Sequence, residues 1–144
     1  MDSEKIRRLL GRVEMFIGVF PADRLPRHRL KKPTLLVVNT DRSDKPGQHW
    51  VAMYFDGEGY GELFDSLATT PIKTFKDFMN RNCARWLKND LQLQSVISRF
   101  CGHYVVMYCL LRARGFDIQR IASLFSNDTL MNDYIVHAFV CRGK

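Results

Sequence analysis

The sequence predicts an α+β domain in which a short mixed sheet packs on a buried central helix. Three observations favour this class. Short segments rich in β-branched residues lie in the middle of the chain, amphipathic segments with helical spacing flank them, and the most apolar segment, residues 101–114, has the length of a helix. The chain has 144 residues, of which 46% are hydrophobic. This is enough for one core, and we expect a single domain over residues 1–144.

The first helix is expected from Ser3 to about Met15, because apolar residues recur there at helical spacing with arginines between them. Pro21, Pro26 and Pro33 then break the chain into an extended basic loop.

Three strands are expected next. Residues 35–39 are a run of Leu and Val that ends in Asn, and residues 50–55 and 60–64 are similarly apolar. A turn with Asp, Ser, Pro and Gly over residues 41–47 separates the first strand from the second. Gly57-Glu58-Gly59 joins the second and third strands as a hairpin.

The rest of the chain is predicted to be mainly helical. The expected elements are a helix over residues 71–87, a strand-like alternation over 91–96, the central helix over 101–114, a short helix over 118–125, and a last helix that Asn127 or Asp128 caps and that runs to Val140.

The formal net charge is +7 and the pI is near 9.5. A basic chain is attracted to polyanions, although such charges are also common on a merely solvated surface. The densest cluster contains Arg27, Arg29, Lys31 and Lys32, and these are the candidate DNA-binding residues.

The sequence shows no secretory signal and no apolar run that would span a membrane, so we expect a protein that is neither secreted nor membrane-bound. The spacing of its cysteines, Cys83, Cys101, Cys109 and Cys141, fits no paired zinc-ligand pattern. We therefore expect no metal site, and one reactive thiol among packing or surface thiols.

Cys101 is the candidate nucleophile. It stands at the predicted N-terminus of the buried helix, where unpaired amides and the helix dipole favour a thiolate. Gly102 follows it, allows a substrate to approach closely and leaves the backbone N–H groups of the Cys101-Gly102 pair unobstructed as oxyanion donors. Residue type alone would favour an inert core cysteine; the position and the upstream partners reverse that interpretation.

His49 is the candidate base, since it follows a Gly-containing turn and opens a strand. Asp65 ends the third strand, and an antiparallel pairing would bring it to the same end of the sheet, where it can orient the imidazole. Glu62 is the alternative acid. Trp50 and Gly47 are expected beside the substrate cleft, although Trp50 would also suit core packing.

Gln94 precedes Cys101 by a short loop, and its amide can donate to an oxyanion. Gln92 has the same parity and is the alternative. Together these residues supply a nucleophile, a base, an orienting acid and an oxyanion donor, which are the roles that a cysteine protease requires.

Three segments carry a family resemblance: GQHWVAMYF over residues 47–55, LFDS over 63–66, and LQSVISRFCGHYVVMYCLL over 93–111. They resemble the adenovirus-type maturation protease, adenain, and in particular its short forms in Maverick/Polinton elements and adintoviruses. FIGVFPADRLP over residues 16–26 resembles those short forms too. The His-Trp, Asp-Ser and Gln-to-Cys-Gly pieces are also shared with the wider clan of ubiquitin-like-protein proteases, whose fold is papain-like.

The resemblance implies the same four roles for His49, Asp65, Gln94 and Cys101. It also implies an endopeptidase of viral or transposon capsid and core precursors, a monomer in the virion and the host nucleus or cytoplasm, with no cofactor required for the chemistry. Adenoviral relatives are stimulated by DNA and by a disulfide-linked peptide, for which Cys83 is a conceivable thiol. The acid here is Asp where adenoviral enzymes have Glu, and the chain is shorter. The alternatives are a SUMO- or NEDD8-type deconjugating protease and an inactive, DNA-binding virion protein with a protease fold.

Overall fold

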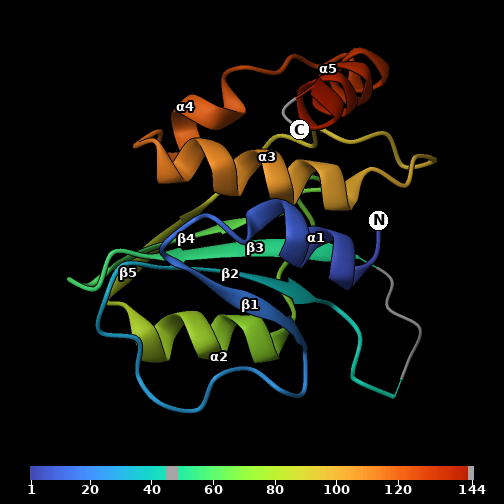
Figure 1. Ribbon diagram of the computed structural model, residues 1–144. Coiled ribbons are helices and arrows are strands. Elements are labelled where there is room, and N and C mark those ends of the chain that lie inside the picture. The colour runs from blue at the N-terminus through green and yellow to red at the C-terminus, as the bar shows by residue number, and fades with distance from the viewer. Residues whose placement is uncertain (45–48, 143–144) are drawn as a thin grey trace.

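The computed structural model describes residues 1–44 and 49–142 as helices stacked on both faces of one mixed sheet (Figure 1). The strands are β1 (Phe16–Pro21), β2 (Thr34–Asn39), β3 (Trp50–Phe55), β4 (Tyr60–Phe64) and β5 (Arg85–Lys88). The helices are α1 (Ser3–Leu10), α2 (Lys73–Asn82), α3 (Cys101–Ala113), α4 (Ile118–Ala122) and α5 (Thr129–Arg142). Helix α2 covers one face of the sheet, α1 and α3 cover the other, and α4 and α5 lie outside α3.

The strand order is β1-β2-β3-β4-β5. The two outer pairs, β1–β2 and β4–β5, are parallel, and the two inner pairs are antiparallel. In the β3–β4 hairpin, Ala52 faces Phe64 across the ladder. The start of β3 and the end of β4 therefore meet at the same edge of the sheet, which is the geometry that the sequence requires for His49 and Asp65.

Strand β2 shows how the sheet builds two cores. Side chains on a strand alternate between faces, so Leu35 and Val37 pack in the core on the α3 side, whereas Leu36 and Val38 pack in the core on the α2 side. All six residues of β2 are buried. A strand that is covered on both faces has a nearly continuous apolar sequence, and Leu35 to Val38 form such a run.

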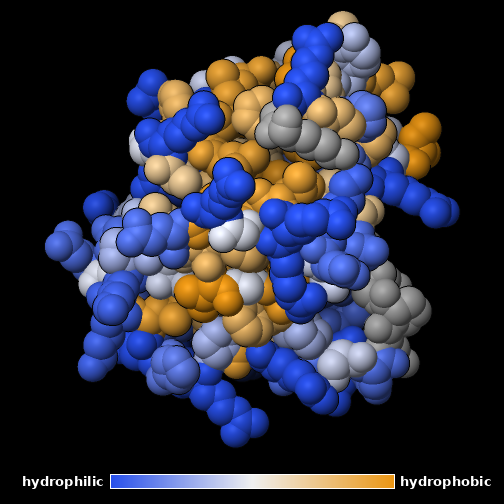
Figure 2. All heavy atoms as spheres, in the orientation of Figure 1, coloured by the Kyte–Doolittle hydropathy of each residue, from blue (hydrophilic) through white to orange (hydrophobic). Residues whose placement is uncertain are grey.

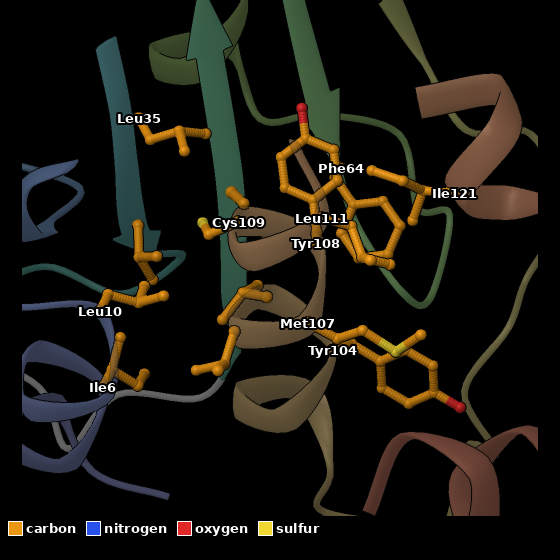
Figure 3. Packing of buried hydrophobic residues seen from close by; sticks show 14 of the residues in the cluster. Ile6, Leu10, Leu35, Phe64, Tyr104, Met107, Tyr108, Cys109, Leu111 and Ile121 are labelled. Atoms are coloured by element: carbon orange, nitrogen blue, oxygen red, sulfur yellow. The ribbon is translucent and has the colours of Figure 1, made fainter. Parts of the chain in front are cut away.

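Helix α3 is the central element of the larger core (Figure 3). Eight of its residues are buried, and they lie on all sides of the helix. The ring of Tyr108 stacks on Phe64 of β4 with centroids 4.8 Å apart, and Ile6 and Leu10 of α1 lie beside the helix. Each large side chain buried in this way contributes roughly 1.5–3 kcal/mol to folding, so the position of α3 is fixed strongly by apolar packing.

The fold class and the main elements agree with the sequence prediction. The strands expected at 35–39, 50–55 and 60–64 are β2, β3 and β4, and the central helix begins at Cys101 as expected. Asp128 caps the last helix, since its Oδ1 accepts from the N–H of Met131 at 3.1 Å.

Two helices were predicted too long, and the two edge strands were missed. Helix α1 ends at Leu10 rather than near Met15, and β1 follows, with Phe16 paired to Leu35. Helix α2 ends at Asn82 rather than near Leu87, and the expected last turn is β5. Each of these strands pairs with one neighbour, β1 with β2 and β5 with β4. Their local sequence would also suit a helix, so it is the pairing with a distant strand that determines their structure.

The strand-like alternation over residues 91–96 was wrong as well, because these residues form no strand. The N–H groups of Leu93 and Gln94 both donate to the carbonyl oxygen of Ser66, at 2.9 and 3.0 Å. The segment is thus tied to the turn after β4. Along the described residues, no helix combines the length and apolar character needed to cross a bilayer.

Cys83 lies in the core on the α2 side and is 5% exposed. Its thiol donates to the carbonyl oxygen of Met79 at 3.1 Å, and burial raises its pKa to about 11. Gly61 lies so close that a Cβ there would be 2.8 Å from the sulfur. Cys83 is therefore one of the packing thiols, and it has no surface position in this structure from which to link a peptide.

Glu62 of β4 is completely buried and ties three elements together. It accepts hydrogen bonds from Tyr60 at 2.6 Å, from Tyr108 of α3 at 2.5 Å and from the N–H of Ile118 of α4 at 3.1 Å. Arg112 Nε lies 3.4 Å from Oε1, within ion-pair range, although it makes no hydrogen bond in this geometry. The carboxylate therefore serves the packing of α3 and α4 on β4.

Replacing Glu62 with Gln should lower the free energy of unfolding by about 2–4 kcal/mol, because an amide NH₂ would then face these donors in a buried site. Urea titration followed by circular dichroism measures the change. Glu58→Gln is the control, since Glu58 is exposed in the β3–β4 turn and its replacement should change stability by less than about 0.5 kcal/mol. Equal small effects for the two variants would contradict this role of Glu62.

Candidate active site

A cleft of about 990 Å³ opens at the end of the sheet where β3 begins. Four of the residues singled out from the sequence line it: His49, Trp50, Gln94 and Cys101. The N-terminal residues of the chain, the end of β1 and the segment before α3 form its walls. The cleft therefore collects residues that are up to 100 positions apart in the chain.

Cys101 is the first residue of α3, and its side chain is partly exposed to this cleft. Burial by itself raises the pKa of the thiol. Hydrogen bonds from the His49 side chain and from the backbone N–H groups of Trp50 and Gly102 outweigh burial and hold the pKa below its ordinary value of 9.0. The N-terminal end of the helix dipole acts in the same direction. The site thus stabilises a thiolate.

His49 connects the thiol to a carboxylate. Its Nε2 lies 2.5 Å from Asp65 Oδ1, which leaves Nδ1 as the ring nitrogen for its hydrogen bond with Cys101. Burial by itself lowers the pKa of His49, but the hydrogen bonds to Asp65 and Cys101 and the charges of both groups raise it to about 9. His49 is therefore an imidazolium at neutral pH, and its positive charge favours the thiolate form of Cys101.

Asp65 follows β4, and its carboxylate accepts several hydrogen bonds. Thr69 Oγ1 donates to Oδ2 at 2.6 Å, and the N–H of Leu67 donates to Oδ1 at 2.9 Å. Burial raises the pKa of Asp65, but the hydrogen bond and charge of His49, with Thr69 and Leu67, keep it below its usual value. The side chain of Asn89 makes two hydrogen bonds to the backbone of Asp65. Its Oδ1 accepts from the Asp65 N–H at 2.9 Å, and its Nδ2 donates to the Asp65 carbonyl oxygen at 2.6 Å.

Gln94 is 3% exposed, and its amide orientation is set by Ser66. Ser66 Oγ donates to Oε1 at 2.6 Å, so Nε2 is the donor end of the amide, and it donates to the carbonyl of Ser98 at 3.1 Å. An amide nitrogen carries two hydrogens, so the bond to Ser98 uses only one of them. Because Gln94 lines the cleft, its amide is a candidate oxyanion donor.

Met1 occupies the space that the sequence analysis assigned to substrate beside Gly102. A Cβ on Gly102 would lie 2.8 Å from the Cβ of Met1. The carbonyl of Met1 also accepts a hydrogen bond from the indole of Trp50 at 3.0 Å. Trp50 thus lines the cleft, as expected, and its ring is fixed by the chain's own first residue.

The alternatives considered from the sequence lie elsewhere. Glu62 is buried in the α3–α4 contact described above and does not reach His49. Gln92 donates to the backbone carbonyl of Gln94 at 2.9 Å and does not line the cleft. Gly47 lies outside the described residues. The basic residues of the segment between β1 and β2 are exposed and also do not line the cleft.

Sequence reasoning gave no role to the residues that hold the site in place, namely Ser66, Thr69 and Asn89. In the sequence, Asp65, Ser66 and Thr69 form only a polar turn after a predicted strand. Asn89 is 24 residues from Asp65 and carried no local signal. Over residues 1–44 and 49–142, no group of three His, Cys, Asp or Glu side chains is arranged to hold a metal ion.

The fold is similar to that of a known protease. Two structures of the ASFV pS273R protease superpose on this chain. One has a TM-score of 0.64 at 18% identity over 94% of this chain and 64% of the protease. The other, with selenomethionine, has a TM-score of 0.56 at 24% identity over 74% and 43%. The chain has the fold of this protease.

The chain spans less than two thirds of the length of these two protease structures. The SUMO protease Ulp1, with its catalytic cysteine oxidized to a sulfinic acid, aligns over 97% of this chain and 62% of its own at 18% identity, with a TM-score of 0.38 that is too low to carry an argument. No protein-family model matches the sequence. No curated protein matches it either.

The thiolate can be tested by alkylation. Iodoacetamide should label Cys101 with a pH midpoint below 9.0, because the donors around the sulfur stabilise its anion. Asp65→Asn should move this midpoint upward, since it removes the charge that favours the imidazolium. Mass spectrometry of the labelled peptides measures both, with the exposed Cys141 as an internal reference.

The control for this prediction is Asp77→Asn, which removes an exposed carboxylate on α2 and should leave the midpoint unchanged. Thermal unfolding of each variant shows that the fold is retained. A wild-type midpoint at 9.0, or equal midpoints in wild type and Asp65→Asn, would contradict the account of the site.

Proposed function

We propose that this protein is a cysteine peptidase. The observation that carries the proposal is the chain of contacts from the Cys101 thiol through His49 to Asp65, with Nε2 and Oδ1 2.5 Å apart, in a cleft on a fold that a known protease shares. Gln94 supports it too, because it lines the same cleft and Ser66 fixes which end of its amide is the donor.

In the first step, the Cys101 thiolate attacks the carbonyl carbon of the scissile amide, and a carbon–sulfur bond forms. Negative charge moves to the carbonyl oxygen, where the amide of Gln94 and the backbone N–H of Cys101 would donate to it. The intermediate collapses as the carbon–nitrogen bond breaks. His49 gives its proton to the leaving amine, and a thioester remains on Cys101.

In the second step, neutral His49 takes a proton from water, and the resulting hydroxide attacks the thioester. The carbon–sulfur bond breaks, the acid product leaves, and the thiolate and imidazolium are restored. Asp65 does not transfer a proton. It holds the imidazole in the tautomer and orientation that both steps need.

The substrates that we propose are capsid or core precursor proteins of a virus or a virus-like transposon. The support is the likeness of residues 47–55, 63–66 and 93–111 to the adenain type of maturation protease, in its short form. On this proposal the enzyme acts as a monomer, in the virion and in the host nucleus or cytoplasm. An activating peptide, if one is used, would have to bind without Cys83.

A deconjugating protease of the SUMO or NEDD8 type is the second candidate. The observation that favours it is the acid, since Asp65 matches the ubiquitin-like-protein branch whereas adenoviral enzymes carry Glu. It predicts cleavage after the Gly-Gly tail of a folded ubiquitin-like domain, and no response to DNA.

The peptidase proposal is tested with a panel of Gly-containing fluorogenic peptides. Cys101→Ala should lower kcat by at least about 1000-fold, since it removes the nucleophile. Gln94→Ala should lower kcat by about 100- to 1000-fold with little change in KM, because an oxyanion donor acts mainly in the transition state. Gln92→Ala is the matched control, and its kcat should stay close to that of the wild type.

Turnover that survives Cys101→Ala would refute the proposal, and so would a wild type that cleaves no peptide and whose Cys101 is not alkylated at neutral pH. Cleavage of SUMO- and NEDD8-fusion proteins but of no linear peptide would favour the deconjugating alternative.

DNA contact through Arg27, Arg29, Lys31 and Lys32 is the other part of the proposal. All four side chains are exposed, and buried Leu30 anchors their segment by donating its N–H to Asn82 Oδ1 at 2.9 Å. Hydrophilic side chains project from the lower part of the molecule in Figure 2, the part where Figure 1 shows this segment beside α2. An inactive DNA-binding protein would share this surface but would not need the thiolate.

Changing all four of these residues to Gln should weaken binding of a duplex DNA and flatten its salt dependence. The log–log slope should become shallower by about 0.9 for each phosphate that the variant no longer neutralises. Fluorescence anisotropy over a range of salt concentrations measures the slope. A control variant removes the same charge elsewhere, at Lys76, Arg114, Arg120 and Arg142. Equal slopes for the two variants would show that the binding is not localised to this segment.

A further inference from the structure

The turn that follows β4 has a strained backbone close to the candidate acid. Ala68 has a φ of 51°, and it is the one residue other than glycine with a positive φ among residues 1–44 and 49–142. Its N–H donates to the carbonyl oxygen of Asp65 at 2.8 Å, which closes the turn. A left-handed alanine costs free energy, because its Cβ crowds the backbone. Such strain persists only where the surrounding structure enforces it, and it is often found at functional sites.

Hydrogen bonds from neighbouring segments enforce this conformation. The side chain of Asn89 holds both the N–H and the carbonyl oxygen of Asp65. The carbonyl oxygen of Ser66 accepts from the N–H groups of Leu93 and Gln94, at 2.9 and 3.0 Å. The start of the turn is therefore fixed to the segment that leads to α3, and the left-handed residue decides where the end of the turn is placed.

The turn ends with Thr69, which contacts the carboxylate of Asp65 twice. Its hydroxyl donates to Oδ2 at 2.6 Å, and its N–H donates to the same oxygen at 3.3 Å. The other oxygen, Oδ1, accepts from the N–H of Leu67 at 2.9 Å and lies 2.5 Å from His49 Nε2. The two oxygens thus have different partners. Because Thr69 holds Oδ2, the carboxylate is not free to rotate, and Oδ1 stays directed at the imidazole.

We propose that Thr69 is a positioning residue, whose hydroxyl keeps the Asp65 carboxylate directed at His49 and thereby sustains the charge of the imidazolium. The kinetic part of this inference rests on the proposed peptidase function. Thr69 does not line the cleft, so it acts through Asp65 and not by contact with a substrate. The strained turn is the structural means by which an exposed threonine is brought back to a buried carboxylate.

The electrostatics of the site give the direction of the expected effect. Burial raises the pKa of Asp65, but the hydrogen bond and charge of His49 outweigh burial, and the Thr69 hydroxyl acts in the same direction as His49. Burial lowers the pKa of His49, whereas Asp65, the titratable group that faces its Nε2, helps to raise it to about 9. Loss of the Thr69 donor should therefore raise the pKa of Asp65, lower that of His49 and raise that of Cys101.

Thr69→Val removes the hydroxyl and keeps the shape of the side chain. Thr69 is exposed, so its replacement leaves no cavity in the core, and thermal unfolding checks that the fold is retained. The pH profile of kcat/KM should become narrower from both sides. Its acid limb should move to higher pH because the thiolate forms later, and its alkaline limb should move to lower pH because the imidazolium loses its proton earlier. At the optimum, kcat should fall about tenfold with KM nearly unchanged.

Thr69→Ser keeps the hydroxyl and should retain the width of the wild-type profile. Thr70→Val is the matched control, since Thr70 is the exposed neighbour and is not among the groups that donate to Asp65 in the described part of the chain. A Thr69→Val profile that is lower but as wide as that of the wild type would overturn the inference, because the ionising groups would then be unaffected. A narrow profile in Thr69→Ser would overturn it too, since the hydroxyl would not be the cause.

Two measurements on the full chain test the positioning role without turnover. In Thr69→Val, the pH midpoint for alkylation of Cys101 by iodoacetamide should be higher than in the wild type, and the His49 ring should titrate at lower pH by ¹⁵N NMR. Thr69→Ser and Thr70→Val should match the wild type in both. Equal values in all four proteins would overturn the inference, whether or not a peptide is cleaved. The expected shifts in a protein that cleaves no peptide would uphold the positioning role and count against the peptidase function alone.

Discussion

The burial of α3 is the constraint on which the rest of the structure depends. The helix is apolar on all sides, and it is enclosed by the sheet, α1, α4 and α5. Its axis cannot move without exposing core side chains, so its first residue has a fixed place at the edge of the sheet. Cys101 thereby meets His49, which stands at the start of β3, and the β3–β4 hairpin supplies Asp65 from its other end. Apolar packing thus brings together a polar site whose residues lie far apart in the sequence.

The sequence predicted the interior of this fold better than its edges. The hairpin and the central helix have patterns that only one element satisfies: alternation bounded by Gly turns, or an apolar run of helical length. The edge strands β1 and β5 lack such a pattern. Apolar residues 13 and 16 also fit the helical spacing of the apolar residues in α1. Arg85–Lys88 likewise continues the helical spacing of the apolar residues in α2. What makes them strands is parallel pairing with β2 and β4, a contact between distant segments that no local pattern reports.

The candidate site also has a part that the sequence predicted and a part that it did not. The four candidate site residues were accessible from sequence because their chemical types and order are restrictive. The structure places His49, Gln94 and Cys101 around one cleft, with Asp65 behind His49. The residues that hold these side chains in place could not be predicted from the sequence. Asn89 acts only through two hydrogen bonds to the Asp65 backbone, and Met1 acts through contacts with Trp50 and Gly102. Such supporting roles depend on distance in space, and the amino-acid type gives little indication of them.

The central claim is that Cys101 and His49 form a thiolate–imidazolium pair in the free protein. The most direct measurement is a pH titration of the His49 ring by ¹⁵N NMR, in wild type and in Cys101→Ala. We predict that His49 titrates near pH 9 in the wild type, because both Asp65 and the thiolate favour its charged form, and that its pKa falls when the sulfur is removed. Titration near the ordinary value of 6.5 in both proteins would contradict the account.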